Sequence, residues 1–321
     1  MTEERTPKVS VLVPCFNVER YVTQCLQSIA CQTLNDMEVI CINDGSTDST
    51  PKLIRRIADN DSRFVVIDKP NSGYGASVNL ALNRARGEYI GIVESDDFIE
   101  PDMFERLYAE ASAYDLDISQ CCYSRHTEGR DKPDPCKFLP KNETYRALDR
   151  LEAFQNPPAI WSAIYRRAFL NDNGIRFLET PGASFQDISF AFKTALMSRR
   201  SRCISKPLLH YRIHQSNSVK KASNPMVVIK EFDEALDYAK TRGLYEKVMP
   251  VMTAVEYASF KWNYLRLNSQ SAHRFFDAWV DRWRKCRGYG VTLQTPKMYF
   301  YYVLITQTPK LFENYLAKKS K

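Results

Sequence analysis

Three carboxylates follow directly behind a short apolar run in residues 87–98, which read GEYIGIVESDDF. The apolar run predicts a buried strand, and Glu94, Asp96 and Asp97 stand where that strand ends. Carboxylates gathered at such a place are costly unless a positive charge neutralises them. Oxygen ligands on a short loop suit a hard divalent cation such as Mg²⁺ or Mn²⁺, which usually also binds substrate phosphates. The alternative is a solvated acidic turn before a helix that begins near Pro101, where acidic residues are common.

The elements that must position this loop are predicted by an alternation of short apolar runs with amphipathic segments between residues 8 and 124. Strands are expected at Val9–Val13, Val39–Ile42, Phe64–Ile67, Tyr89–Val93 and Ile118–Cys122, and helices at about 18–31, 49–60, 75–86 and 101–113. The alternation predicts an α/β fold, a mostly parallel sheet sandwiched by helices.

Polar side chains follow each of the first four predicted strands. They are Asn17, then Asp44 within NDGS, then Asn71, and then the acidic loop. In parallel sheets ligands bind beyond the carboxyl ends of the strands, so this edge is the expected site. The stretch DGSTD at 44–48 also suits a plain turn followed by a helix N-cap.

Several classes of protein are disfavoured by the sequence. The first predicted strand is followed by VPCFN, which lacks the glycines of a dinucleotide site or a P-loop. The best apolar stretch, 299–305, is far shorter than the roughly 18 residues of a membrane span. The beginning, MTEERTPK, has no apolar signal core, and the nine cysteines form no CxxC pair or disulfide framework. We therefore expect a cytoplasmic protein with reduced thiols and no nucleic-acid partner.

Beyond residue 124 the pattern is less regular. Residues 125–145 are polar and lack periodicity, so a loop or an insertion is expected there. A helix is expected at 149–155, an amphipathic helix from Phe185 to about Met197, and a strand at Ile204–Tyr211. From Pro225 onward only helical patterns occur. We therefore expect two parts, residues 1–222 with the sheet and residues 223–321 as a basic, aromatic-rich helical region.

An ordered set of motifs resembles the family-2 glycosyltransferases of the GT-A fold. The resemblance covers about residues 8–218. Its motifs are VSVLVPCFN (9–17), SIACQT (28–33), VICINDGSTDST (39–50), NSGYGASVNLAL (71–82), ARGEYIGIVESDDF (85–98), and later IWSAIYRRAFL, FQDISF and HYRIHQSNS. One of these motifs alone would be weak, whereas the ordered set is specific.

The resemblance implies a role for individual residues. It implies that Pro14 and Phe16 line the pocket for the nucleotide base and that Asp44 accepts a hydrogen bond from that base. Asn17 and Asn71 on the same edge are assigned to the donor as well. Asp97 is the expected direct ligand of Mg²⁺ or Mn²⁺, Asp96 lies near the ribose and the metal, and His214 falls near the diphosphate or the metal. A histidine considered by itself is more often a satisfied structural group than a ligand.

Asp187 matches the carboxylate that deprotonates the acceptor hydroxyl. Its place at a predicted helix start is expected to lower its pKa and keep it ionised. Three positions depart from the common pattern: Glu94 replaces Asp, Phe16 replaces Tyr, and Gln186 replaces the Glu before the base. Of the three, only Gln186 removes a carboxylate, which could alter acceptor binding or the pKa of Asp187.

The reaction implied is sugar transfer, with inversion, from a nucleotide-diphospho-sugar to a hydroxyl. A UDP-sugar is the favoured donor, and a glycan or lipid-linked molecule of cell-surface polysaccharide synthesis is the expected acceptor. Two alternatives stay open. A non-catalytic nucleotide-sugar-binding or scaffold protein would agree with the Gln186 departure. A sugar-phosphate nucleotidyltransferase would need a glycine-rich basic loop after the first strand, which this chain lacks.

The end of the chain carries most of the positive charge. Residues 199–321 contain 23 Lys and Arg against 9 Asp and Glu, a balance of +14, whereas residues 1–198 sum to −7. Within 273–290, Phe276, Trp279, Val280 and Trp283 recur at helical spacing among Arg274, Arg282, Lys285 and Arg287. Basic helices with aromatic residues suit an anionic membrane surface, so we expect peripheral attachment to the inner face of the membrane. The alternative is a helical subdomain whose aromatic residues are core.

Overall fold

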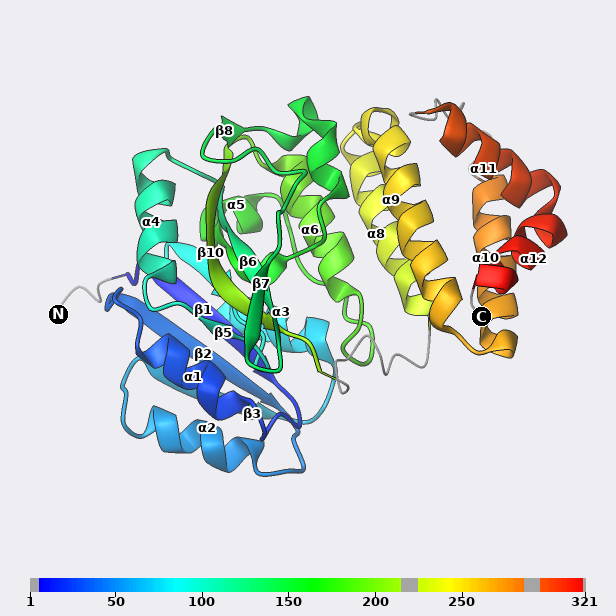
Figure 1. The fold of residues 1–321 in the computed structure, drawn as a ribbon. Helices are drawn as coiled ribbons and strands as arrows, with labels where there is room; N and C mark the ends of the chain where they lie inside the picture. Colours follow the sequence, from blue (N-terminus) through cyan, green and yellow to red (C-terminus); the bar gives the residue numbers. More distant parts are fainter. Residues whose placement is uncertain (1–5, 215–224, 286–294, 320–321) are drawn as a thin grey trace.

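The computed structural model describes residues 6–214, 225–285 and 295–319 (Figure 1). Residues 6–214 contain one large β-sheet. Its strands, in spatial order, are β3 (Phe64–Lys69), β2 (Met37–Asp44), β1 (Val9–Cys15), β4 (Tyr89–Ile92), β9 (Ala163–Arg166), β6 (Ile118–Thr127), β10 (Ser201–Arg212) and β5 (Phe98–Ile99). The strands from β3 to β4 are all parallel, as expected. The second half is mixed, because β9 runs antiparallel to both β4 and β6.

Helices cover both faces of the parallel half. They are α1 (Val22–Ala30), α2 (Thr50–Ala58), α3 (Tyr74–Arg84) and α4 (Met103–Ala113), followed by α5 (Arg167–Asp172) and α6 (Gln186–Met197). Figure 1 shows α1 and α2 in front of the sheet and α3 behind it. Every residue of β1 and β2 is buried, which is why these strands are continuous apolar runs rather than alternating ones. The expected α/β fold is confirmed.

The register places the strand ends beside one another. Cys15 at the end of β1 pairs with Asn43 near the end of β2, and Asp44 pairs with Lys69 at the end of β3. The loops after these strands therefore leave the sheet at one edge.

Residues 125–145, expected to be a loop or an insertion, contain short strands among irregular segments, so the expectation of a plain loop was only partly right. Strand β6 continues to Thr127 and turns through Glu128 and Gly129, both at positive φ, into β7 (Arg130–Pro133). A short strand β8 (Thr144–Tyr145) then pairs with β10. All four residues of β7 are exposed, so this edge strand lacks the apolar alternation that marks a strand in sequence. The helix expected at 149–155 forms instead as two short 3₁₀ turns, Ala147–Asp149 and Leu151–Gln155.

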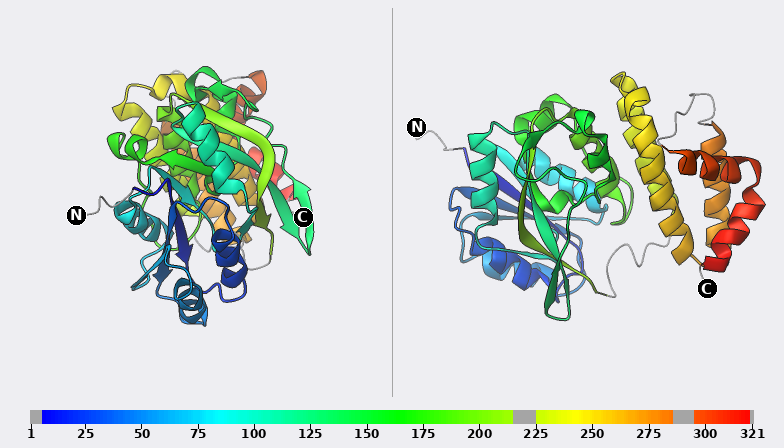
Figure 2. Two further views of the ribbon diagram at one scale, coloured as in Figure 1. Left: turned by 90° about the vertical axis from the view of Figure 1, so that its left-hand side faces the viewer. Right: turned by 45° about the horizontal axis from the view of Figure 1, so that its top comes forward.

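The described part of the C-terminal region is helical: α8 (Met226–Thr241), α9 (Tyr245–Arg266), α10 (Ser269–Lys285), α11 (Pro296–Gln307) and α12 (Pro309–Lys319). Helix α8 lies along α6, where Lys193 contacts Glu234 at 2.9 Å, and α9 to α12 pack beyond it (Figures 1 and 2). The expected boundary at 222/223 lies outside the described residues.

The aromatic stripe of α10 is core. Phe276, Trp279, Val280 and Trp283 are at most 4% exposed, and Trp283 donates to Glu256 at 2.9 Å. Arg282 is ion-paired with Glu256 and Asp233, so it is a structural cation rather than a free one. For this stripe the alternative, a helical subdomain whose aromatic residues are core, therefore holds, and attachment of the C-terminal region to a membrane stays a prediction. Arg287, assigned to the same surface, lies outside the described residues. Among the described helices, none combines the length and apolar character needed to cross a bilayer.

Candidate active site

The loops after β1 and β2 are tied together by Asn17. Its side-chain oxygen accepts from the N–H of Thr47 at 2.8 Å, and its own N–H donates to the Ser46 hydroxyl at 3.1 Å. Asn17 has φ 50°, a left-handed conformation that asparagine tolerates better than most residues. Next to it, Pro14 is buried in β1 and the ring of Phe16 is 47% exposed. An apolar ring is therefore presented at the sheet edge where a flat ligand would be expected to bind.

The carboxylate of Asp44 organises the loop after β3. It accepts from the N–H groups of Ser72 at 2.9 Å and Gly73 at 3.0 Å, and it is ion-paired with Lys69. Asp44 is only 4% exposed, while Asn71 in the loop after β3 is exposed. A carboxylate offers about four acceptor positions, so Asp44 is fixed in place and can still accept one donor from a ligand.

Two glycines bring this loop against the segment that precedes α6. Gly73 has φ +95°, and a Cβ there would lie 2.9 Å from the Thr180 carbonyl oxygen; at Gly75 it would lie 2.2 Å from that of Leu178. The N–H of Tyr74 donates to the Gly182 carbonyl at 2.9 Å. The NSGYG motif therefore allows a close backbone contact between two segments that are more than 100 residues apart in the chain.

Asp97 is buried, and one of its two oxygens is unpaired. Its exposure is 1%; Oδ1 accepts from the N–H of Arg212 at 2.8 Å, and Oδ2 has no hydrogen-bond partner among the described residues. Burial raises the pKa of Asp97 well above its usual value, and the charge of Asp96 raises it further. A buried, unpaired carboxylate oxygen is costly, and a bound cation would remove that cost.

Asp96 and His214 meet beside Asp97. Nε2 of His214 lies 2.9 Å from Oδ2 of Asp96, and the His214 ring packs 4.5 Å from the ring of Tyr21. Arg212 donates through Nε to the Asp96 carbonyl at 2.7 Å, so the end of β10 holds the loop from the other side. The structure thus places His214 in contact with Asp96, and Asp97 follows Asp96 in the same loop. Two carboxylates and an imidazole are a donor set that fits Mn²⁺ or Mg²⁺ bound together with phosphate oxygens.

Glu94 adds a third carboxylate to the same centre. It accepts from the hydroxyl of Tyr74 at 2.6 Å, and burial raises its pKa to about 8, with the charges of Asp96 and Asp187 acting in the same direction. Tyr211 lies close to these carboxylates. Burial raises the pKa of Tyr211 to about 12, and the negative charges of Asp97, Asp96, Asp187 and Glu94 raise it further. The Tyr211 ring stacks on Trp161 at 5.2 Å and 5°. The centre therefore combines concentrated negative charge with an aromatic wall.

Asp187 lies in the first turn of α6, which begins after Phe185 in the left-handed conformation (φ 75°). Burial raises the pKa of Asp187 to about 6, and the backbone N–H groups of Asp187 and Ile188 oppose that rise only in part. The expectation that the helix start would lower this pKa was wrong, because the loss of water outweighs the helix dipole. A carboxylate with such a pKa is a better proton acceptor near neutral pH than an ordinary Asp.

Gln186, the departure before the base, is hydrogen-bonded to the segment that precedes α6. Its amide nitrogen donates to the Thr180 hydroxyl at 2.9 Å and to the Gly182 carbonyl at 3.4 Å, and it is 2% exposed. It therefore fixes the segment that contacts Gly73, and it is not among the causes of the Asp187 pKa shift.

The raised pKa of Asp187 should make the rate of sugar transfer depend on pH. If Asp187 must be ionised to accept a proton, kcat/KM should fall about tenfold per pH unit below pH 6, because a raised pKa makes the protonated form dominant there. The measurement is a pH–rate profile of the wild-type chain with metal present. A flat profile from pH 5 to 7 would contradict the assignment.

Some residues of the site had no signal in the sequence. Glu231 of α8 is fully buried; its carboxylate accepts from the N–H of Ser189 at 3.3 Å, and burial together with the charge of Asp187 raises its pKa to about 7. The C-terminal region thus places a carboxylate behind α6. Lys69, the last residue of β3, and Tyr74, the first of α3, had only their places beside the loop to suggest a role, since their partners Asp44 and Glu94 are 25 and 20 residues away.

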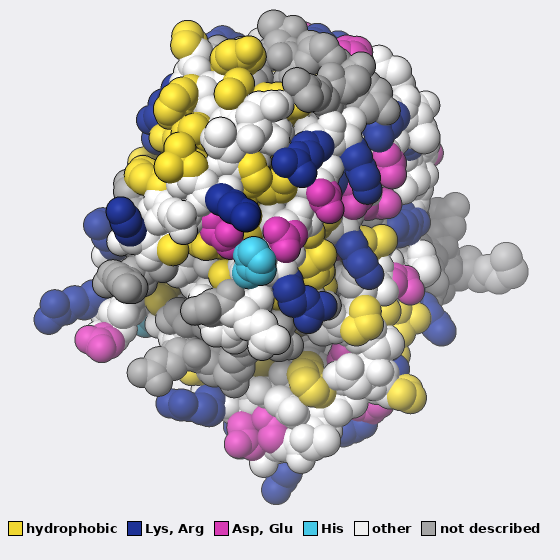
Figure 3. Space-filling view, turned by 90° about the vertical axis from the view of Figure 1, so that its right-hand side faces the viewer, with side chains coloured by type: hydrophobic (Ala, Val, Ile, Leu, Met, Phe, Trp, Pro, Cys, Tyr) yellow, Lys and Arg dark blue, Asp and Glu magenta, His cyan; other side chains and the backbone are white. Residues whose placement is uncertain are grey.

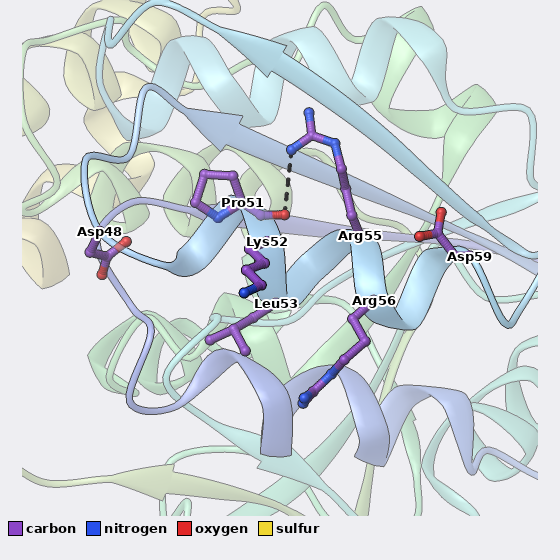
Figure 4. Close-up of a pocket in the computed structure, with 7 residues that line it drawn as sticks. All are labelled: Asp48, Pro51, Lys52, Leu53, Arg55, Arg56 and Asp59. Atoms are coloured by element: carbon purple, nitrogen blue, oxygen red, sulfur yellow. Dashed lines mark hydrogen bonds between the residues drawn. The ribbon is translucent and has the colours of Figure 1, made fainter.

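A separate surface depression of about 670 Å³ lies along α2 (Figure 4). Its lining comes entirely from residues 48–59, and Arg55 there donates to the Pro51 carbonyl at 3.4 Å. It contains none of the expected site residues.

The fold and these strand-end residues define a GT-A-type α/β protein, and comparison with known proteins gives the family. Residues 10–173 match the model of Glycosyl transferase family 2. This match spans more than half of the chain, so the chain belongs to glycosyl transferase family 2. It is 34% identical over 225 residues to EpsH of Bacillus subtilis (strain 168), which is named as a glycosyltransferase; the match covers 67% of this chain and 64% of that relative.

Solved structures agree on the fold. S. aureus TarS 1-349 in complex with UDP-GlcNAc matches with a TM-score of 0.69 and 24% identity, covering 86% of this chain and 81% of TarS 1-349. The mannosyltransferase PcManGT from Pyrobaculum calidifontis, in complex with GDP-Man and Mn²⁺, matches with a TM-score of 0.53 and 19% identity over 99% of this chain and 88% of its own. At these identities the likeness supports the fold alone.

Proposed function

We propose that this chain is an inverting glycosyltransferase that moves a sugar from a nucleotide-diphospho-sugar to a hydroxyl group. The observation that best supports the proposal is a pair of separate carboxylate sites, one in the loop after β4 and one at the start of α6. Asp97, with a buried unpaired oxygen, stands beside Asp96 and His214, while Asp187 lies at the start of α6 with a raised pKa. Direct displacement requires both: one site for the diphosphate and one for the attacking hydroxyl.

Each residue then has one task. Phe16 and Pro14 would contact the base, Asp44 would accept a hydrogen bond from it, and Asn17 and Asn71 would border the nucleotide. Asp97 and Asp96, with His214, would hold Mg²⁺ or Mn²⁺, which when bound supplies positive charge to the diphosphate leaving group. Asp187 would accept the proton of the acceptor hydroxyl at its carboxylate. Tyr74 would keep Glu94 in place behind them.

The favoured donor is a UDP-sugar, and the favoured acceptor is a glycan or a lipid-linked molecule. Two features support this choice: membership in the family, and a structural neighbour whose complex holds UDP-GlcNAc. The second neighbour holds GDP-Man with Mn²⁺, so the panel that tests the proposal must include both bases.

The test is release of nucleoside diphosphate by the purified chain with Mn²⁺ from a panel of UDP- and GDP-sugars. We expect one donor to be turned over well above the others, and the rate to rise when the correct acceptor is added. Binding of a donor without any turnover, with or without acceptors, would favour the non-catalytic alternative. The Gln186 departure does not itself support that alternative, since Gln186 contacts Thr180 rather than Asp187.

We also propose that the chain attaches to an anionic membrane surface, through α11 and α12 rather than α10. These two helices carry four apolar or aromatic residues that are 41–63% exposed: Tyr299, Phe300, Leu311 and Tyr315. They also carry three exposed lysines: Lys297, Lys310 and Lys318. Figure 3 shows hydrophobic side chains gathered on the face of the C-terminal helices with Lys and Arg around them. Aromatic groups beside lysines suit an anionic interface, where each Lys contributes about 1 kcal/mol.

Co-sedimentation with liposomes tests this attachment. The wild-type chain should bind vesicles rich in anionic lipid at low salt and dissociate as salt rises. The variant Phe300→Ser/Leu311→Ser should lose most of this binding, whereas Val65→Ser, which removes an exposed apolar residue of β3, should not. Equal partition onto neutral and anionic vesicles, or none at low salt, rules the attachment out.

A further inference from the structure

Two histidines and a carboxylate converge beside β5, the short strand that follows the acidic loop. His126 of β6 and His210 of β10 each place Nδ1 2.9 Å from the same oxygen, Oδ1 of Asp131 in β7. These three ligand atoms all lie within 4.8 Å of one another. His126 pairs directly with Asp131 across the β6–β7 hairpin (Figure 2), and β10 runs parallel to β6 on its other side. Three neighbouring strands therefore each contribute one potential ligand.

A fourth residue orients one of the rings. Nε2 of His210 lies 2.8 Å from Oε1 of Glu100, so both ring nitrogens of His210 face a carboxylate oxygen. A neutral imidazole has only one N–H, so this arrangement needs either a second proton or a cation on the Asp131 side. A carboxylate that accepts from the outer nitrogen of a histidine is the usual companion of a metal-bound imidazole.

The surroundings fix the two rings. Phe98 stacks on His210 at 4.3 Å and 4°, and its ring meets His126 edge-on at 5.0 Å. The two histidine side chains are only 14–16% exposed, while Asp131 is 40% exposed. One side of the cluster is thus closed by an aromatic ring, and the other is open to solvent.

We propose that His126, Asp131 and His210 bind a zinc-type divalent ion, with Glu100 as the outer carboxylate. Two imidazole nitrogens and one carboxylate oxygen favour Zn²⁺ over Mg²⁺, which prefers oxygen ligands. Metal–ligand bonds of about 2.0–2.2 Å in a tetrahedron separate the ligand atoms by about 3.3 Å. The two 2.9 Å contacts to Asp131 would therefore lengthen slightly, and the two imidazole nitrogens, which lie within 4.8 Å of each other, would adopt the same separation. The fourth position is open to water. The ion would join the β6–β7 hairpin to β10, the strand whose end holds Asp97 and Asp96.

The first experiment titrates the full metal-free chain with ZnCl₂ in saturating MgCl₂ and measures binding by calorimetry. A parallel titration uses Co²⁺ and measures the visible absorption of the bound ion. We expect one zinc ion bound at this cluster and the strong visible bands of four-coordinate Co²⁺. His126→Gln and Asp131→Asn should each abolish both signals. Glu100→Gln keeps all three ligands and should weaken binding about 10–100-fold.

Two histidine variants serve as matched controls. His273→Gln, on α10 outside both sites, and His214→Gln, at the donor site, should leave the Co²⁺ bands unchanged. Circular dichroism confirms that each variant is folded. Zinc binding that His126→Gln and Asp131→Asn leave unaltered, or no zinc binding by the wild-type chain, would overturn the proposal and leave the protonated histidine network in its place. Neither readout uses sugar transfer, so the result is independent of the proposed function.

Discussion

The Asp97→Asn variant should lose turnover by about 10³-fold or more. The bound metal is expected to contribute several kcal/mol to the transition state, and each 1.4 kcal/mol or so corresponds to a factor of ten. The amide keeps the shape of the side chain and its hydrogen bond from Arg212, but it removes the charge that would hold the cation. The measurement is nucleoside diphosphate release with Mn²⁺, together with Mn²⁺ affinity by calorimetry.

The thermal stability of this variant distinguishes a metal ligand from a structural residue. Without metal, the wild-type chain buries a carboxylate oxygen that has no partner among the described residues, so Asp97→Asn should not lower the melting temperature of the metal-free protein. Asp115→Asn, which alters an exposed partner of Arg166, is the matched control and should retain full activity. Full turnover by Asp97→Asn in excess EDTA would exclude the metal role.

Asp187→Asn should lower kcat by about 10²–10⁴-fold with little change in donor affinity. The amide cannot accept the proton of the acceptor hydroxyl, whereas the residues proposed to contact the nucleotide lie in other loops. The loss of rate is measured with donor and acceptor both saturating, and donor affinity is measured separately by calorimetry. The fall of kcat/KM below pH 6 should also disappear from whatever activity remains.

The control for this variant is Asp172→Asn, the same chemical change at an exposed residue at the end of α5. It should leave both kcat and donor affinity unchanged. If donor affinity collapses together with the rate in Asp187→Asn, then Asp187 belongs to the donor site and is not the base.

Much of the site could be predicted from sequence because it lies at the ends of parallel strands. The buried runs before Asn17, Asp44 and Asp97 are short, continuous and apolar, so their ends could be located to within a few residues. Parallel strands carry their carboxyl ends to one edge, and that alone was enough to group these residues. The departure at Gln186 was also visible, although its contacts were not.

The raised pKa of Asp187 was decided only by the tertiary structure. The sequence shows the helix start, which lowers the pKa, but not the water-free surroundings that raise it to about 6. The sequence gives even less indication of Glu231. This residue lies 42 positions beyond Ser189, on another helix, and belongs to no recognisable motif. Its proximity to Asp187 depends on how α8 packs on α6.

For the C-terminal aromatic residues, too, the sequence determined one property and the tertiary structure another. Helical spacing predicted that Phe276, Trp279 and Trp283 share one face of a helix, and they do. Spacing does not say what covers that face, because a core and a membrane bury the same apolar surface. The packing of α9, α11 and α12 decided that α10 is core and left Phe300 and Leu311 exposed instead. Local pattern is set by short-range periodicity, whereas the partner of each face and the water around each charge are set by contacts between distant segments.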